Sequence, residues 1–404
     1  MKTLEERLRK YISFDTMSDE ESETCPSTEG QRVLGQVLVE ELKELGLEEV
    51  NQDLNGYVYG SLAGNVEGIP AIGLIAHMDT SPDAPGKVDD PQVLQYEGGT
   101  IPLSEKKVLS PDDFPFLNDL VGQTLMTTRG DTLLGADDKA GIAIIMHVLE
   151  TLVRDPSIPH GPVKVAFTPD EEIGRGADKF DVEAFGADFA FTIDGGEMPG
   201  FEYETFNAAS AKLEVEGKNV HPGSAKGTMV SAAEIALEFH SLLPAEKKPQ
   251  YTEGREGFIH LLHMEGTVDQ AKMDYIIRDH DRAAFQALKE VMEGALAYIN
   301  KKHGPVARLE IKDSYYNMRE KVEEHPEIIA LVKRAFAKVG LEPEIVPVRG
   351  GTDGAGLSFK GLPTPNLFTG GYNYHGVYEF ISLDQMARSA DVVLSILQEN
   401  TRKN

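Results

Sequence analysis

Residues 71–79 read AIGLIAHMD, a run of small and apolar residues that stops at a histidine and an aspartate. Similar short apolar runs occur at 163–168 and 189–193, and a helical pattern at 138–153 lies between the first two runs. Buried strands of parallel sheets show such near-continuous apolar runs, and strands that alternate with helices are typical of βαβ units. The sequence therefore predicts an α/β fold with a mixed, largely parallel sheet flanked by helices.

Polar residues follow each of these runs at the point where the run ends. A fourth apolar run lies at 365–368. The residues of metal-binding type that follow the four runs are His77, Glu171, Glu172, Asp194 and His375. In an open α/β sheet, ligands bind beyond the carboxyl ends of the strands. We therefore expect these side chains to meet at one edge of the sheet, although they lie far apart in the sequence.

Asp137 adds a further carboxylate of metal-binding type, and it stands in a turn that leads into the predicted helix. Two imidazoles together with the carboxylates of Asp137, Glu172 and Asp194 suit a pair of borderline metals. One carboxylate then bridges, and each metal takes one histidine and one further carboxylate. Such metals lie about 3.5–4 Å apart and lower the pKa of a shared water to roughly 7. The sequence thus predicts a hydrolytic dimetal centre.

A hydrolase of this kind also needs a base that is not a metal ligand. Glu171 is the candidate, because in a loop its side chain can point in a different direction from that of the adjacent Glu172. Asp79 lies two residues after His77, a spacing that lets its carboxylate accept the second ring N–H and set the tautomer. Asp79 is therefore predicted to orient His77.

Each of these residues, taken alone, has a simpler interpretation. An acidic pair such as Glu171-Glu172 is most often solvated, and a lone histidine such as His77 is most often buried and hydrogen-bonded. Asp137 and Asp138 alone would most often cap the following helix. The joint placement of these residues after successive strands favours the metal site.

The composition narrows the classes of partner and compartment. The 404 residues include 39 Lys and Arg against 67 Asp and Glu, and the resulting net charge of −28 repels nucleic acid and anionic membranes. Cys25 is the only cysteine, which excludes an internal disulfide and fits a reducing compartment. No run of eighteen apolar residues or apolar signal region occurs. We expect a cytoplasmic protein with neither a nucleic acid nor a membrane partner.

One helix is predicted from its ends as well as its periodicity. Thr28 and Gln31 have the spacing of a capping box, and leucines follow at helical spacing from Leu34 to Leu45. Gly46 is the expected stop of this amphipathic helix.

Several motifs along the chain match a known family. They are HMDT at 77–80, GADDKAG at 135–141, TPDEE at 168–172, RGGTDG at 349–354 and NLFTGGYNYHG at 366–376. With these motifs the chain resembles, nearly end to end, the tripeptide aminopeptidases of the co-catalytic dizinc peptidase and aminoacylase superfamily.

The resemblance implies a role for each candidate residue. It implies two Zn²⁺ ions per subunit, bridged by Asp137, with the other ligands in two pairs: His77 with Asp194, and Glu172 with His375. Glu171 would act as general base and acid, and Asp79 would stand behind the first histidine. The resemblance also implies a cis peptide bond between Asp137 and Asp138.

The domain organisation follows partly from the same features. The segment 210–312 lacks ligand-bearing strand ends and contains helical patterns such as 283–299, whereas sheet-type motifs return at Arg349. We therefore expect a catalytic domain of residues 1–209 and 313–404, interrupted by an inserted domain of 210–312. The resemblance implies that the insertion is a small α/β lid, a sheet with two helices, which in relatives also mediates dimerisation. A homodimer through this lid is thus a predicted assembly.

Four substrate contacts are predicted from motifs in or beside the lid. The resemblance implies that His221 donates a hydrogen bond to the oxyanion and that Arg278 binds the substrate carboxylate. The resemblance adds Asn207 and Arg349 as substrate-pocket residues. For an isolated Arg278 a surface ion pair is the commoner role, and Arg349 could equally orient the glycine-rich turn that follows it.

The predicted reaction is removal of the N-terminal residue from a tripeptide by a bridging, zinc-activated hydroxide, with Glu171 as general base and acid. Zinc, cobalt and manganese share such ligands, so the metal itself stays open. Alternatives on the same scaffold are a dipeptidase, a carboxypeptidase or an N-acyl amino acid deacylase. A non-catalytic metal-binding protein is a further alternative, but metal binding alone has no need of an unligated base such as Glu171.

Overall fold

The computed structural model describes residues 2–402, and the chain divides into two compact units. The first unit comprises Met1–Tyr203, Met318–Val346 and Thr352–Asn404, and the second comprises Glu204–Asn317 and Pro347–Gly351. The predicted insertion, 210–312, lies within the longer segment of the second unit. Within residues 2–402, no helix is both long enough and apolar enough to cross a membrane.

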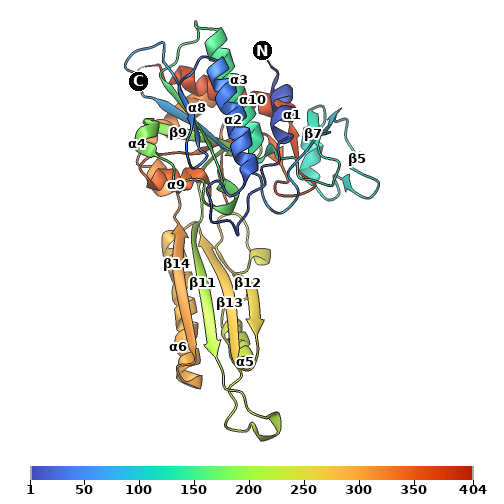
Figure 1. The fold of residues 1–404 in the computed structure, drawn as a ribbon, viewed down its shortest axis with the longest axis vertical. Helices are drawn as coiled ribbons and strands as arrows, with labels where there is room; N and C mark the ends of the chain where they lie inside the picture. The colour runs from blue at the N-terminus through green and yellow to red at the C-terminus, as the bar shows by residue number, and fades with distance from the viewer. Residues whose placement is uncertain (1, 403–404) are drawn as a thin grey trace. The chain divides into compact units, whose positions relative to one another are not determined.

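The first unit is built around an eight-stranded sheet (Figure 1). Its strands lie in the order β1 (Glu48–Gln52), β2 (Val58–Leu62), β8 (Val163–Thr168), β3 (Ile72–His77), β9 (Phe189–Gly195), β16 (Asn366–Phe368), β10 (Gly200–Glu204) and β15 (Glu344–Pro347). β3 pairs in parallel with β8 and β9, and β16 pairs in parallel with β9. The pairs β1/β2, β2/β8 and β10/β16 are antiparallel. The predicted mixed sheet is confirmed, and its parallel strands lie at the centre.

Helices cover both faces of this sheet. The unit has a larger and a smaller hydrophobic core. The helices that pack in the larger core are α1 (Leu4–Ile12), α2 (Glu29–Glu44), α3 (Ala136–Arg154), α7 (Arg319–Val322), α8 (Pro326–Lys338) and α10 (Leu383–Glu399). Those that pack in the smaller core are α4 (Val182–Phe185) and α9 (Asp353–Phe359). Successive side chains of a strand point to opposite faces, so Leu74 and Ala76 of β3 enter the larger core and Ile75 enters the smaller one. Burial on both faces explains why the central strands read as continuous apolar runs.

A separate four-stranded sheet was not predicted from the sequence. Its order is β17 (Gly371–Tyr372), β18 (Phe380–Ser382), β7 (Thr124–Thr127) and β4 (Gln92–Gln95), and the short pair β5 (Ile101–Pro102) and β6 (Val108–Leu109) and the 3-10 helix η1 (Pro115–Leu120) share its core. β17 and β18 are antiparallel neighbours. The loop 373–379 that joins them, and that contains His375, is therefore held at both ends.

The second unit has its own sheet and core. The antiparallel sheet has the order β12 (Phe258–Gly266), β13 (Gln270–Asp279), β11 (Asn207–Glu216) and β14 (Ala307–Tyr315). Alternate residues of β11, such as Leu213 and Val215, pack in one core with α5 (Ala232–Ser241) and α6 (Arg282–His303). The short 3-10 helices η3 (Pro222–Ser224) and η4 (Pro249–Tyr251) lie in its loops. The predicted sheet with two helices is thus found.

The predicted helix after Thr28 is present, but its predicted cap is wrong. Thr28 is the N-cap residue of α2, yet its side chain accepts no capping hydrogen bond. The Gln31 amide instead donates to Oδ1 of the buried Asp170 at 2.7 Å, and its Oε1 accepts the Asp170 N–H at 3.1 Å. The Gln31 amide also donates to the Thr28 hydroxyl at 3.2 Å, but this contact is not a capping box, because the Thr28 side chain accepts no backbone N–H of the helix. A buried carboxylate needs hydrogen-bond donors, so Gln31 also serves Asp170.

Candidate metal centre

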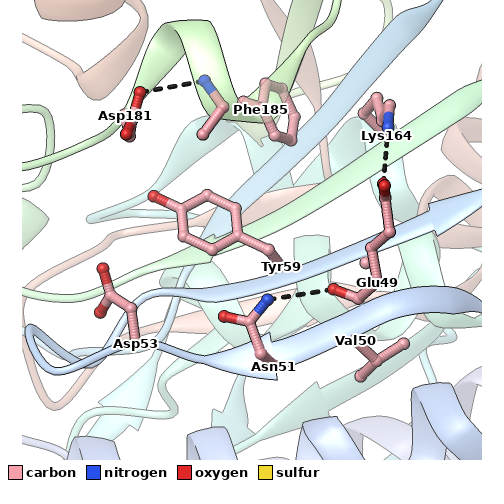
Figure 2. Close-up of a pocket in the computed structure, with 10 residues that line it drawn as sticks. Glu49, Val50, Asn51, Asp53, Tyr59, Lys164, Asp181 and Phe185 are labelled. Atoms are coloured by element: carbon pink, nitrogen blue, oxygen red, sulfur yellow. Dashed lines mark hydrogen bonds and ion pairs between the residues drawn. The ribbon is translucent and has the colours of Figure 1, made fainter.

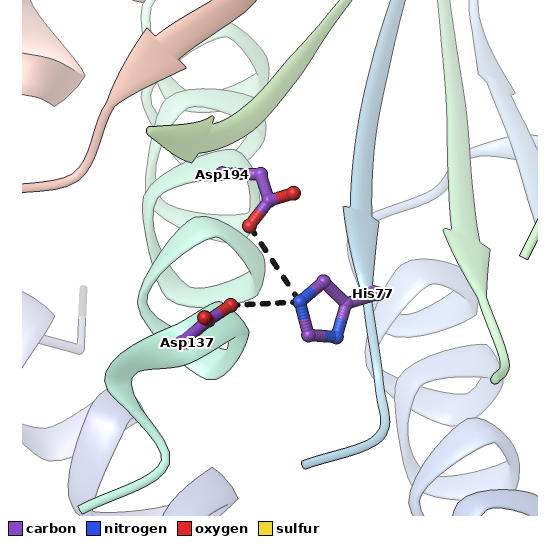
Figure 3. A group of neighbouring side chains, drawn as sticks. All are labelled: His77, Asp137 and Asp194. Atoms are coloured by element: carbon purple, nitrogen blue, oxygen red, sulfur yellow. Dashed lines mark hydrogen bonds and ion pairs between the residues drawn. The ribbon is translucent and has the colours of Figure 1, made fainter. Parts of the chain in front are cut away.

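Five predicted ligands lie at the carboxyl edge of the central strands and form two groups that share one member. In the first group, His77 ends β3 and Asp194 lies near the end of the adjacent β9. Nε2 of His77 lies 2.8 Å from Oδ1 of Asp137 and 3.5 Å from Oδ1 of Asp194 (Figure 3). Asp137 reaches this position from the first turn of α3.

The second group joins Asp137 to residues from two other segments. Nε2 of His375 lies 2.9 Å from Oε2 of Glu172 and 3.4 Å from Oδ2 of Asp137. Glu172 lies in the 3-10 helix η2 (Glu171–Ile173), which follows β8. His375 lies in the loop between β17 and β18 with a left-handed φ of 64°.

Asp137 is common to both groups, and its two oxygens are divided between them. Oδ1 faces His77 and Oδ2 faces His375. In each group the potential ligand atoms lie within 4.8 Å of one another. This arrangement fits two metal ions with a carboxylate between them.

The charges of the cluster favour bound cations. Burial raises the pKa of Glu172 to about 7 and that of Asp194 to about 8, and the Asp137 carboxylate acts in the same direction on both. Burial also opposes ionisation of Asp137, but hydrogen bonds with His375 and His77 hold its pKa below the usual range. Oε1 of Glu172 is buried and has no hydrogen-bond partner among residues 2–402. Divalent cations would neutralise the crowded carboxylates and occupy this oxygen, so the residues fit a dimetal centre.

Asp79 connects the first histidine to the acidic loop. Nδ1 of His77 lies 3.3 Å from Oδ1 of Asp79 and 3.1 Å from its carbonyl oxygen. The same carboxylate accepts the backbone N–H of Glu171 at 3.0 Å and that of Glu172 at 3.1 Å. The position fits the predicted orienting role and adds a second one, since Asp79 also holds the loop that carries Glu171.

Glu171 stands apart from both ligand groups. Its side chain is half-buried and belongs to neither group of potential ligands within residues 2–402. Burial raises the pKa of Glu171 well above its usual value. The preceding Asp170 has a left-handed φ of 59°, and its carboxylate is held by the N–H and hydroxyl of Ser27. A carboxyl group of raised pKa beside a metal site is suited to taking up and returning a proton.

The two aspartates at the start of α3 have different environments. The peptide bond between Asp137 and Asp138 is cis, which confirms the prediction. Asp138 is buried, and its oxygens accept the backbone N–H of His77 at 3.2 Å and that of Gly141 at 3.1 Å. The helix-capping interpretation therefore describes Asp138, whereas Asp137 faces the two histidines.

Two buried carboxylates beside the centre were missed by the sequence analysis. Glu379 accepts backbone N–H groups from the turn before Asp137, and Asp353 accepts the Thr168 hydroxyl at 2.6 Å. Burial raises the pKa of each carboxyl group to about 7. Asp353 lies in the quoted motif at 349–354, and Glu379 follows His375 by four residues, but neither spacing by itself indicates a partner.

Two of the predicted substrate residues bond to the backbone of the second unit. Asn207 is fully buried, donates to the carbonyls of Asp279 and His280 at 3.0 and 3.1 Å, and accepts the Asn317 N–H at 3.1 Å. Arg349 donates from both terminal nitrogens to the 252–256 loop, including 2.7 Å to the carbonyl of Gly254. Its guanidinium also lies 5.1 Å from the ring centre of Phe206. These contacts give both residues a role in shaping the loops of the unit.

The other two candidates make fewer hydrogen bonds. His221 is exposed, and its Nδ1 accepts the Gly223 N–H at 3.1 Å. Nη1 of Arg278 donates to the carbonyl of Arg349 at 3.2 Å, and its buried Nε has no partner among residues 2–402.

A pocket of about 690 Å³ lies elsewhere in the first unit (Figure 2). Residues of β1, β2, β8 and α4 line it, and Lys164 pairs with Glu49 across it at 3.0 Å. None of the predicted site residues belongs to its lining, so it carries none of the predicted chemistry.

Comparisons with known proteins identify the family of the chain. Residues 127–399 match the peptidase family M20/M25/M40. Two proteins named peptidase T, from Caldanaerobacter subterraneus subsp. tengcongensis and Geobacillus thermodenitrificans, are each 53% identical to this chain. The alignment covers 98% of both sequences for the first relative and 97% of both sequences for the second. The solved structure of a tripeptidase from Staphylococcus aureus is similar to this chain with a TM-score of 0.79 and 22% sequence identity. The superposition covers 99% of this chain and 98% of that structure, so the two share a fold. The chain therefore belongs to peptidase family M20/M25/M40 and, within it, to the peptidase T group, in agreement with the predicted metallo-aminopeptidase.

Proposed function

We propose that the chain is a cytoplasmic dizinc aminopeptidase that removes the N-terminal residue from tripeptides. One observation carries the proposal: the oxygens of Asp137 lie 2.8 Å from Nε2 of His77 and 3.4 Å from Nε2 of His375. A carboxylate in this position is suited to holding two metal ions a few ångströms apart. The relatives named peptidase T and the structural neighbour called a tripeptidase support the choice of substrate.

The proposed reaction divides the work among the residues of the first unit. The predicted ligands would hold two zinc ions, one on His77 and Asp194 and one on Glu172 and His375, with Asp137 between them. When bound, such ions lower the pKa of a shared water and polarise the substrate carbonyl. Glu171 takes a proton from the attacking water and passes it to the leaving amine. Asp79 holds the His77 ring with Nε2 towards Asp137.

Residues of the second unit are proposed to contact the substrate. Because Nδ1 of His221 accepts a hydrogen bond, the ring N–H is on Nε2, which is proposed to donate a hydrogen bond to the oxyanion. Arg278, whose Nη1 donates to the carbonyl of Arg349, is proposed to bind the substrate carboxylate with its planar guanidinium. Asn207 and Arg349 are proposed to shape the substrate pocket through the loops that they hold.

A substrate panel tests the proposed specificity. A free tripeptide is expected to be cleaved faster than both its N-acetyl form and its C-terminal amide, because the reaction needs a free N-terminus and Arg278 needs a carboxylate. Initial rates on the three compounds, with product identification by mass spectrometry, measure this. Fastest cleavage of the acetylated peptide would instead identify an N-acyl amino acid deacylase, and release of the C-terminal residue would identify a carboxypeptidase.

Metal removal tests the chemistry of the centre. Dialysis against a chelator is expected to abolish tripeptide hydrolysis, and two equivalents of Zn²⁺ per chain are expected to restore it. Metal content by plasma mass spectrometry, measured beside activity, follows both steps, and Co²⁺ and Mn²⁺ in place of Zn²⁺ test which metal supports turnover. Activity that persists in metal-free protein would contradict the proposal.

A homodimer through the second unit and a cytoplasmic location stay predictions from the sequence. The peptide substrate, by contrast, follows from membership of the peptidase family.

A further inference from the structure

Glu379 places one buried carboxylate against the turn that carries Asp137. The side chain is 1% exposed and stands directly before β18. Its Oε2 accepts the backbone N–H of Leu134 at 2.7 Å and that of Gly135 at 2.9 Å. Its Oε1 accepts the backbone N–H of Asp137 at 3.1 Å. Three donors of a single turn therefore converge on one side chain from a distant part of the chain.

The turn cannot satisfy these donors by itself. The N–H groups at the start of an α-helix have no partner within the helix and are usually capped by a nearby side chain. The N-cap of α3 is Gly135, which has no side chain and a left-handed φ of 74°. Asp137 and Asp138 depart from helical geometry, and the carboxylate of Asp138 bonds to His77 and Gly141 instead. Asp138 therefore caps the helix only after the cis bond, and the N–H groups of Leu134, Gly135 and Asp137 are satisfied by Glu379 instead.

Glu379 also belongs to the loop that carries the second histidine. It follows His375 by four residues, and its own N–H donates to the carbonyl of Gly376 at 3.0 Å. Thr128, the residue directly after β7, also holds this loop, because its hydroxyl donates to the carbonyl of Val377 at 3.2 Å. One residue thus connects the His375 loop to the backbone of Asp137.

We propose that Glu379 is a positioning residue that sets the Asp137 carboxylate relative to His375 and so fixes the geometry of the shared ligand. The proposal rests on the dimetal centre of the proposed function and adds a residue to it that contacts neither metal nor substrate. Residues that orient metal ligands typically change metal affinity or activity by 10- to 100-fold when replaced.

The three backbone N–H groups of this turn need hydrogen-bond acceptors at both Oε1 and Oε2 of residue 379. Glutamine has nearly the same shape as glutamate, but its amide nitrogen donates and would face a backbone N–H that also donates. Glu379→Gln therefore breaks at least one of the three contacts while it keeps the volume. Glu379→Asp keeps the charge and both acceptors on a shorter side chain, so it tests whether a carboxylate there restores part of the function.

The experiment compares wild type, Glu379→Gln, Glu379→Asp and a matched control. Glu41→Gln is the control, because Glu41 is also a buried glutamate of the first unit and bonds to Lys10 and Tyr11 at 2.7 and 2.5 Å, not to any predicted ligand. The measurements are Zn²⁺ stoichiometry, Zn²⁺ affinity by competition with a chelator, the visible spectrum of the Co²⁺-loaded protein, and kcat and KM separately. Thermal unfolding of each metal-free protein identifies variants that are merely unstable.

Glu379→Gln is expected to bind metal 10- to 100-fold more weakly, to change the Co²⁺ spectrum, and to lose kcat with little change in KM, since Glu379 does not contact the substrate. Glu379→Asp is expected to recover part of the lost affinity, and Glu41→Gln is expected to keep wild-type affinity. Wild-type affinity and an unchanged spectrum in Glu379→Gln would overturn the proposal. If that variant does not fold, Glu379→Ala takes its place, and wild-type affinity with an unchanged spectrum in Glu379→Ala would overturn the proposal. Failure of the wild type itself to bind two metals would instead overturn the proposed function.

Discussion

Glu171→Gln is expected to lower kcat for tripeptide hydrolysis by about 10²- to 10⁴-fold while the protein still binds two metal ions. The carboxylate of Glu171 lies outside both ligand groups, so its replacement leaves the metal ligands in place. An amide cannot take up the proton of the attacking water or return it to the leaving amine. The loss is therefore expected in kcat, with metal content unchanged.

The adjacent residue provides the contrast for this test. Glu172→Gln changes the neighbouring side chain in the same way, but Oε2 of Glu172 lies 2.9 Å from Nε2 of His375 in the second group. This variant is expected to lose metal as well as activity, and plasma mass spectrometry with steady-state kinetics separates the two results. Unchanged turnover in Glu171→Gln would remove Glu171 from the mechanism, and loss of a metal would make it a ligand.

Asp137→Ala is expected to remove both metals and to lower kcat/KM by about 10³-fold or more. Each metal contributes several kcal/mol of transition-state stabilisation, and each 1.36 kcal/mol corresponds to a factor of ten in rate. Because the two oxygens of Asp137 are divided between the groups, its loss takes a ligand from both.

Asp194→Ala is the matched comparison for the shared ligand. Asp194 belongs only to the first group, so this variant is expected to lose one metal and to keep affinity for the other. Isothermal titration of the metal-free proteins with Zn²⁺ counts the sites, and thermal unfolding checks that both variants are folded. If Asp137→Ala and Asp194→Ala each lost the same single metal, Asp137 would not be a bridge.

The central strands and the residues at their ends were predictable because one physical rule relates them. A strand buried on both faces reads as an apolar run, and the end of a parallel strand marks the edge where ligands bind. His77 and Asp194 follow directly from this rule. His375 was harder to place from the rule alone, since its position depends on the pairing of β17 with β18 in a second, unpredicted sheet.

Contacts between a side chain and distant backbone left no pattern in the sequence. Gln31 has the spacing of a local cap, but its Oε1 accepts the backbone N–H of Asp170, 139 residues away, and its amide donates to the buried carboxylate of the same residue. Glu379 likewise serves a turn 242 to 245 residues away. The predicted helix was correct in the first case although its cap was wrong, since the apolar periodicity of α2 does not depend on the cap.

Local residue order established the chemical inventory of this protein: two imidazoles, a set of carboxylates and an unligated glutamate, each at the end of an apolar run or the start of a helix. This inventory can be read from the sequence because apolar runs and helical patterns depend on residues that are close together in the chain. Folding in three dimensions decided that Asp137 is the shared carboxylate, that Nε2 of each histidine faces it, and that Glu379 holds its backbone. These features depend on distances of a few ångströms between segments far apart in the chain, and only the packing of strands, helices and loops around both sheets sets such distances.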